Sequence, residues 1–139
     1  KNDQLRKYEI QKDGIDIDIY LPFYSKLPLL ERINRYSTEV EGFNIVKPEV
    51  LLVLKQAAEL DRKESEKGLK DRIDIMDLLF KCEINFDFYE DLIQKENLNH
   101  YKKRLIEIIN SFNEIKYIGL NPREFKLKKI EILNEIKKI

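Results

Sequence analysis

The sequence predicts an α+β protein in which a small β-sheet is followed by a helical bundle. Residues 15–21 alternate strictly between apolar and polar side chains, which is the period of a half-buried strand. From Pro48 onwards, apolar residues recur every three or four positions, as they do in amphipathic helices. Because the strand signals come before the helical ones, we expect a partial sheet and then a separate layer of helices.

The strand signals consist of a hairpin and a shorter strand. Residues 5–11 and 15–21 read as two strands joined by Asp13 and Gly14, a pair that favours a tight hairpin turn. The remaining signals before Pro48 predict a short helix over residues 28–36 and a strand within residues 40–46, with Gly42 as a bend or bulge.

Five helices are expected after the strands. Pro48 suits a first helical position, and Glu49 then lies near the positive end of the helix dipole. Gly68 is expected to interrupt the helical pattern and to separate the first two helices. Asn121 reads as the cap of the last helix. The expected helices cover residues 48–66, 69–81, 85–94 or 87–94, 97–113 or 99–113, and 121–139.

Length and composition indicate one soluble domain without a charge bias. The chain has 139 residues, which suffices for a hydrophobic core, and we expect the sheet (residues 1–47) and the helical region (residues 48–139) to form one compact domain. Lys and Arg total 26, as do Asp and Glu. Net charge therefore favours neither general nucleic-acid binding nor an acidic partner.

The same composition indicates a cytoplasmic protein. The single cysteine, Cys82, cannot form an internal disulfide and follows an apolar run, so we expect a buried thiol in a reducing compartment. Neither a signal peptide nor an apolar run of the ~20 residues that span a bilayer is visible, and no membrane partner is expected. Because the chain opens on Lys1 rather than on methionine, we expect further residues upstream.

The most informative segment covers residues 47–79, KPEVLLVLKQAAELDRKESEKGLKDRIDIMDLL. It places five charges among helical apolar positions, namely Lys55, Arg62, Lys70, Asp71 and Asp74. This order resembles the helical motif that follows the catalytic sheet in nucleotidyltransferase-fold proteins, a group that includes abortive-infection toxin-like and uncharacterised microbial members. With the strand GIDIDIY over residues 14–20, the resemblance covers about residues 8–82.

The resemblance implies Mg²⁺-dependent transfer of a nucleoside monophosphate from a nucleoside triphosphate to an acceptor. As acceptor we consider a tRNA or a protein. It implies that Asp16 and Asp18 are catalytic residues and ligands of Mg²⁺ or Mn²⁺. It assigns nucleotide and phosphate binding to Lys55, Arg62, Lys70 and Asp71. The family places a Gly-Ser or Gly-Gly pair before its Asp-h-Asp strand, where h is hydrophobic, and this chain contains neither pair. We therefore expect residues 16–18 to belong to the strand of the third carboxylate, and the first part of the motif to be lacking.

The residues of the strand support the same chemistry but leave an alternative open. Asp16 and Asp18 are two positions apart and share one face, while the isoleucines at positions 15, 17 and 19 are expected to point into the core. Paired carboxylates bind hard divalent cations, which neutralise phosphate charge during nucleotidyl transfer. The alternative is a solvated acidic edge strand that prevents aggregation.

Two readings also stay open for the helical charges. Lys55, Glu59 and Arg62 share one helix face, where the basic residues either bind phosphates or form a surface ladder with Glu59. Lys70 and Asp71 either line the nucleotide cleft or belong to a structural group. In that second reading, Asp71 and its neighbour Asp74 hold the basic residues of the first helix in place, or cap the second helix.

Three functional hypotheses follow. The first is a nucleotidyltransferase, incomplete as given. The second is a non-catalytic, nucleotidyltransferase-like module that binds a partner or acts as an antitoxin. The third is a helical interaction domain whose acidic strand has no role in chemistry. Under each of these three hypotheses, we consider that the chain forms a homo-oligomer.

Overall fold

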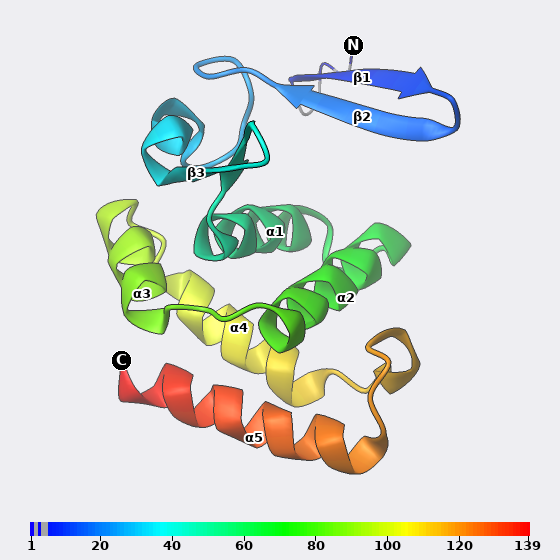
Figure 1. Cartoon of the computed structure of the whole chain (residues 1–139), viewed down its shortest axis with the longest axis vertical. Helices are drawn as coiled ribbons and strands as arrows, with labels where there is room; N and C mark the ends of the chain where they lie inside the picture. Colours follow the sequence, from blue (N-terminus) through cyan, green and yellow to red (C-terminus); the bar gives the residue numbers. More distant parts are fainter. Residues whose placement is uncertain (2, 4–5) are drawn as a thin grey trace. The chain divides into compact units, whose positions relative to one another are not determined.

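The computed structural model describes residues 1, 3 and 6–139 and has an α+β architecture, which confirms the predicted fold class (Figure 1). The chain divides into two compact units, Lys1–Val46 and Lys47–Ile139. Within the described residues, the first unit holds the strands and the second holds the α-helices.

The predicted hairpin is present in the first unit. Strand β1 (Lys7–Lys12) pairs antiparallel with β2 (Ile15–Tyr20), and Lys12 lies opposite Ile15. The two turn residues have positive φ angles, 52° at Asp13 and 78° at Gly14. This backbone conformation matches the twist of the flanking strands and is the one that Asp-Gly adopts readily.

A second hairpin replaces the single short strand expected near Gly42. Strands β3 (Ser37–Val40) and β4 (Phe43–Val46) pair with each other around Glu41 and Gly42, whose φ angles are 50° and 82°. The short helix before them is a 3₁₀ helix, η1 (Leu30–Tyr36). The described strands thus form two separate two-stranded sheets.

The expectation that the isoleucines of β2 are buried is wrong. The exposed fractions are 64% for Ile15, 43% for Ile17 and 38% for Ile19. Alternation correctly placed them on one face, but alternation does not show whether a second layer covers that face. Within residues 1, 3 and 6–139, this sheet has two strands.

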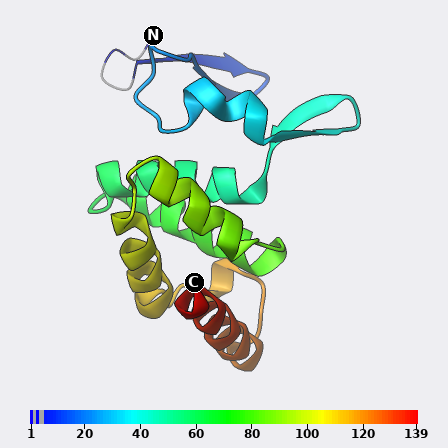
Figure 2. The same ribbon diagram turned by 90° about the vertical axis from the view of Figure 1, so that its left-hand side faces the viewer.

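The second unit consists of five α-helices and a 3₁₀ turn (Figures 1 and 2). Helix α1 contacts three others in the unit, and α4 contacts α5. The last helix has the predicted cap, because the Asn121 side chain accepts from the backbone of Glu124 and the Glu124 side chain accepts from that of Asn121. The bounds are α1 Pro48–Arg62, α2 Glu66–Lys81, α3 Phe86–Lys95, α4 His100–Ser111, η2 Ile115–Tyr117 and α5 Pro122–Lys138.

The sequence predicted that Gly68 separates the first two helices. In the structure Gly68 lies instead in the first turn of α2. The helix is capped by Ser65, whose hydroxyl accepts a 3.2 Å hydrogen bond from the Gly68 N–H. A Cβ atom at this position would lie 2.4 Å from the carbonyl oxygen of Arg62. Glycine is therefore required because the end of α1 passes directly against the start of α2.

Polar side chains of α1 reach into the interior and bind the other helices. The Gln56 side chain is fully buried, donates to the Tyr101 carbonyl at 2.8 Å and accepts from the Tyr89 hydroxyl at 2.7 Å. Glu49 accepts a 2.7 Å hydrogen bond from the backbone N–H of Asn85, the cap residue of α3. Helix α1 is thus tied to α3 and α4 by hydrogen bonds as well as by apolar packing. Among the described helices, none is both long and apolar enough to cross a bilayer.

Candidate functional site

The two candidate metal ligands lie on the polar face of the β1–β2 hairpin. The pairing register sets Asp18 opposite Glu9 and Asp16 opposite Gln11, so the two aspartates share a face as predicted. Asp16 accepts a 3.2 Å hydrogen bond from the Gln11 amide. Asp18 is bound more strongly, by the ammonium of Lys7 at 2.6 Å.

Lys7 lies between the carboxylates of Asp18 and Glu9 on this face. Its ammonium lies 2.6 Å from Asp18 and 3.0 Å from Glu9, and the residue is only 7% exposed. Burial by itself lowers the pKa of Lys7, but the hydrogen bonds to Asp18 and Glu9 outweigh it and raise the pKa above its usual value. The lysine therefore stays protonated and supplies the positive charge that a metal ion would otherwise supply to Asp18.

Metal ligands do not gather elsewhere in the part of the chain that the structure describes. Residues 1, 3 and 6–139 contain no group of three or more His, Cys, Asp or Glu side chains arranged to hold an ion.

The thiol of Cys82, expected to be buried, is exposed just after the end of α2.

The charges of the helical motif form ion pairs between α1 and α2. Arg62 binds Asp71 through two parallel hydrogen bonds, Nε to Oδ2 at 2.7 Å and Nη2 to Oδ1 at 2.8 Å. Only 4% of the Asp71 side chain is exposed. The bidentate geometry fixes the guanidinium and satisfies a carboxylate that is out of contact with water. This contact corresponds to the structural reading of Asp71.

A second ion pair joins the same two helices, seven residues before Arg62 in α1 and three residues after Asp71 in α2. The Lys55 ammonium is 2.6 Å from Asp74, and both side chains are partly exposed. Lys70, the remaining basic residue of the motif, is exposed on α2. The resemblance assigns metal binding to Asp16 and Asp18 of the first unit and phosphate binding to Lys55 of the second unit, and this assignment stays a prediction.

Glu59 does not form a surface ladder with Lys55 and Arg62, which was one of the two readings of this helix face. Its side chain is fully buried and binds two arginines from other helices. Arg104 of α4 donates from Nε to Oε2 at 3.0 Å and from Nη2 to Oε1 at 2.6 Å. Arg72 of α2 donates to Oε1 at 3.0 Å and to the carbonyl of Lys63 at 2.8 Å.

This arrangement keeps Glu59 ionised. Burial alone raises the pKa of a carboxyl group, but the hydrogen bonds from Arg104 and Arg72 together hold the pKa of Glu59 below its usual value. The hydrogen bonds that Arg104 donates to Glu59 in turn raise the pKa of Arg104. The three side chains connect α1, α2 and α4 at one point.

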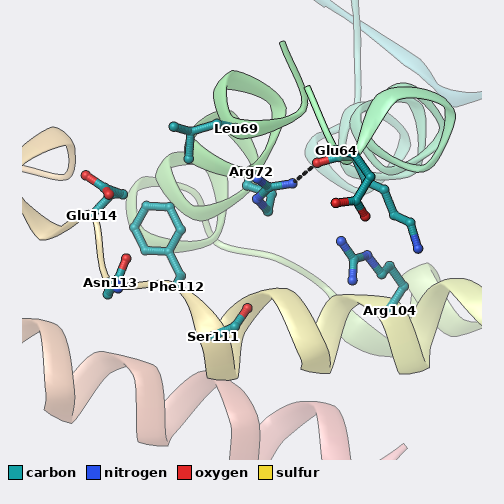
Figure 3. A pocket seen from close by; sticks show the side chains of 9 residues that line it. Glu64, Leu69, Arg72, Arg104, Ser111, Phe112, Asn113 and Glu114 are labelled. Atoms are coloured by element: carbon teal, nitrogen blue, oxygen red, sulfur yellow. Dashed lines mark hydrogen bonds between the residues drawn. The ribbon is translucent and has the colours of Figure 1, made fainter. Parts of the chain in front are cut away.

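A pocket of about 350 Å³ opens beside this group (Figure 3). Figure 3 shows Arg72 and Arg104 on its wall, with Phe112 and Glu114 on the side of the loop after α4. Its lining comprises Lys63, Glu64, Leu69, Arg72, Arg104, Ser111, Phe112, Asn113 and Glu114.

The charges of the pocket balance, and they do not favour an anionic ligand. Three basic lining residues are matched by the lining carboxylates Glu64 and Glu114 and by the buried Glu59 beneath them. The sequence could have placed Glu59 correctly, because it continues the buried stripe of Leu52 and Gln56 at helical spacing. No signal identified its partners in α2 and α4, which are 13 and 45 residues away.

The other face of the β1–β2 hairpin is apolar and exposed. The register sets Tyr8 opposite Ile19 and Ile10 opposite Ile17, with Ile15 at the turn end of the same face. Tyr8 is 40% exposed and Ile10 is 48% exposed. A contiguous apolar surface of this kind is typical of an interaction site.

Comparison with protein-family models, with curated proteins and with solved structures gave no match to this chain. The candidate functions therefore depend on the geometry of the two units and on the sequence resemblance.

Proposed function

We propose that this chain is a non-catalytic, nucleotidyltransferase-like module that acts by binding a protein partner in the cytoplasm. One observation carries the proposal: four of the side chains that the resemblance assigns to metal, nucleotide or phosphate binding are held in three internal ion pairs. Arg62 is held by Asp71, Lys55 by Asp74, and Asp18 by Lys7.

The Arg62 pair is the hardest of the three to reconcile with nucleotide binding. A triphosphate that recruited Arg62 would leave the carboxylate of Asp71 buried without its partner. Breaking a buried pair in this way costs about 3–5 kcal/mol, which a nucleotide would have to offset before it gained affinity. The Lys55 pair is more exposed and contributes little, so it presents a weaker obstacle.

The exposed apolar face of the β1–β2 hairpin supports the binding role. An isolated two-stranded hairpin is marginally stable in water and normally needs a further strand or a packed layer. The exposed face could pack against such a layer, because it carries no charge apart from Lys12 at its end. It consists of Tyr8, Ile10 and the three isoleucines of β2. A second copy of the chain and a different protein both fit this surface in principle, and a homo-oligomer is one form of the proposal.

Mg²⁺-dependent nucleotidyl transfer remains the second candidate. It is favoured by the common face of Asp16 and Asp18 and by the exposure of Lys70. In this case a nucleoside triphosphate binds together with Mg²⁺ or Mn²⁺, and the acceptor is a tRNA or a protein.

Nucleotide binding separates the two candidates. The melting temperature of the full chain is measured with each of the four nucleoside triphosphates, with and without Mg²⁺ or Mn²⁺, and transfer from α-labelled nucleotides to tRNA and protein is followed. A ligand at 100 times its Kd adds about 2.7 kcal/mol of stability, so binding is readily seen. We expect no metal-dependent rise and no transfer.

The matched variants are Asp16→Asn with Asp18→Asn, and Glu39→Gln as an exposed control on the other hairpin. A metal-dependent rise in melting temperature that disappears only in the aspartate variant would overturn the proposal and establish the second candidate.

A further inference from the structure

The open edge of β2 differs from that of β1 in a way that indicates what kind of segment binds there. In the described sheet each strand has one neighbour, so β2 has a free edge. Alternate residues of an antiparallel strand direct their backbone N–H and C=O groups away from the existing neighbour. These groups are ready to pair with an added strand.

The edge of β2 is protected against such pairing only by the carboxylates of Asp16 and Asp18, which repel another acidic strand but not a basic one. Natural edge strands are often blocked by lysine, proline or a bulge. Strand β1 carries lysine at both ends, Lys7 and Lys12. Strand β2, with the sequence IDIDIY, contains neither lysine nor proline and pairs with β1 in continuous register.

The charges beside this edge determine which sequence an added strand should have. The polar face of the hairpin carries three carboxylates, Glu9, Asp16 and Asp18, and one lysine, Lys7. Asp16 accepts a hydrogen bond from the neutral amide of Gln11, which does not match its charge. A strand placed beside β2 would therefore gain from basic residues on the polar face and from apolar residues next to the isoleucines.

A second copy does not satisfy the same edge. Antiparallel pairing of two β2 strands would bring the acidic positions of one copy beside those of the other. Like charges on directly opposed positions destabilise a sheet. The edge thus discriminates against its own copy while accepting a basic strand.

From these observations we infer that β2 is a docking edge for an extended segment of another protein in which apolar residues alternate with lysine or arginine. This inference rests on the proposed binding function and specifies the partner. The segment adds a third strand to the β1–β2 sheet. Its basic residues lie beside Asp16 and Asp18, and its apolar residues extend the face formed by Ile15, Ile17 and Ile19.

Synthetic peptides test the inference on the full chain. The probe is a blocked hexapeptide that alternates lysine and valine, with one N-methyl group on its outer edge to stop self-pairing. One control alternates glutamate and valine, and another has the lysine and valine residues in two separate blocks. Binding is measured by fluorescence anisotropy at low and high salt, and protection of the amides of residues 15–20 is measured by hydrogen exchange.

We expect the alternating basic peptide to bind at least about tenfold more tightly than either control, because two cross-strand ion pairs are lost or reversed in the controls. Its affinity should fall with added salt, and protection should appear in β2. In the chain, Asp16→Asn should weaken binding, whereas Glu39→Gln on the other hairpin should leave it unchanged.

Three results would overturn the inference: equal binding of the acidic and basic peptides, binding without protection of β2, and protection of β2 that depends on chain concentration alone. The last result identifies a second copy as the occupant. None of these results concerns nucleotides. Failure of the partner assignment therefore stays distinct from failure of the proposed function, which metal-dependent nucleotide binding would reveal.

Discussion

Arg62 and Asp71 face each other at the junction of α1 and α2, with the guanidinium fork of one matched to both carboxylate oxygens of the other. Nine residues separate them in sequence, and the turn around Ser65 brings them together. The residues that most resemble a nucleotide-binding motif are thus also the residues that join the first two helices of the bundle.

Replacing Asp71 by asparagine should destabilise the chain while preserving its shape. The amide cannot accept two charge-assisted hydrogen bonds from Arg62, and a partly buried guanidinium loses its counter-charge. We expect a loss of about 1–3 kcal/mol in the free energy of unfolding, measured by chemical denaturation. Asp61→Asn, at an exposed position of α1, is the control. An equal loss in both variants would contradict the role assigned to the pair.

Replacing Glu59 by glutamine should be more damaging. Arg72 and Arg104, which are themselves partly exposed, would then share a neutral side chain in place of the fully buried carboxylate. Removing one member of a buried ionic group typically costs about 3–5 kcal/mol. The matched control is Glu107→Gln, which removes the exposed partner of Arg104 and should cost less than about 1 kcal/mol.

Acid should reduce the difference between the wild type and the Glu59→Gln variant. The pKa of Glu59 is lowered in the folded state, so its ionised form contributes stability above the pKa of the unfolded carboxyl, about 4.3. That contribution is lost as the pH falls through the lowered pKa. Denaturation midpoints from pH 7 down to pH 3 should converge for the two proteins. A constant difference over this range would show that the charge of Glu59 is unimportant.

Replacing Gly68 by alanine should destabilise the junction of α1 and α2, although alanine favours helices in general. The added methyl group would lie within 2.8 Å of backbone atoms of Lys63 and closer still to the Arg62 carbonyl, and backbone cannot move aside easily. We expect a cost of about 1–3 kcal/mol, measured from the shift in melting temperature. Lys67→Ala, one position earlier and exposed, should be neutral or slightly stabilising.

The pair of Lys55 and Asp74 should contribute little to stability. Both side chains are partly exposed, and solvent screens their attraction. A double-mutant cycle with Lys55→Ala and Asp74→Ala should give a coupling free energy below about 1 kcal/mol. A coupling of several kcal/mol would instead indicate that the pair is structurally as important as Arg62 and Asp71.

Local signals in the sequence predicted local structure well. Asp13 and Gly14 adopt the backbone angles that their turn requires, and Asn121 caps α5 as its position before Pro122 indicates. These features depend on a few neighbouring residues, so one sequence is enough to recognise them. The common face of Asp16 and Asp18 was predictable for the same reason.

Features that depend on distant partners were missed. Ile17 has the spacing of a core residue but lies on a sheet that has only two strands, so it remains exposed. Glu59 has the spacing of a surface ladder but is buried, because Arg104 reaches it from 45 residues away. Periodicity gives the face on which a side chain lies. It does not give the element that covers that face.

The internal hydrogen bonds of α1 have a consequence for dividing the chain. Glu49 and Gln56 find their partners in α3 and α4, which follow in the sequence only after α2 is complete. A fragment that ended at Lys81 would contain the closely paired α1 and α2, but it would expose to water the surface of α1 that α3 and α4 cover, including these polar groups. Two fragments divided at Lys81 should therefore remain largely unstructured when separate and should recover the helical unit by complementation when they are mixed.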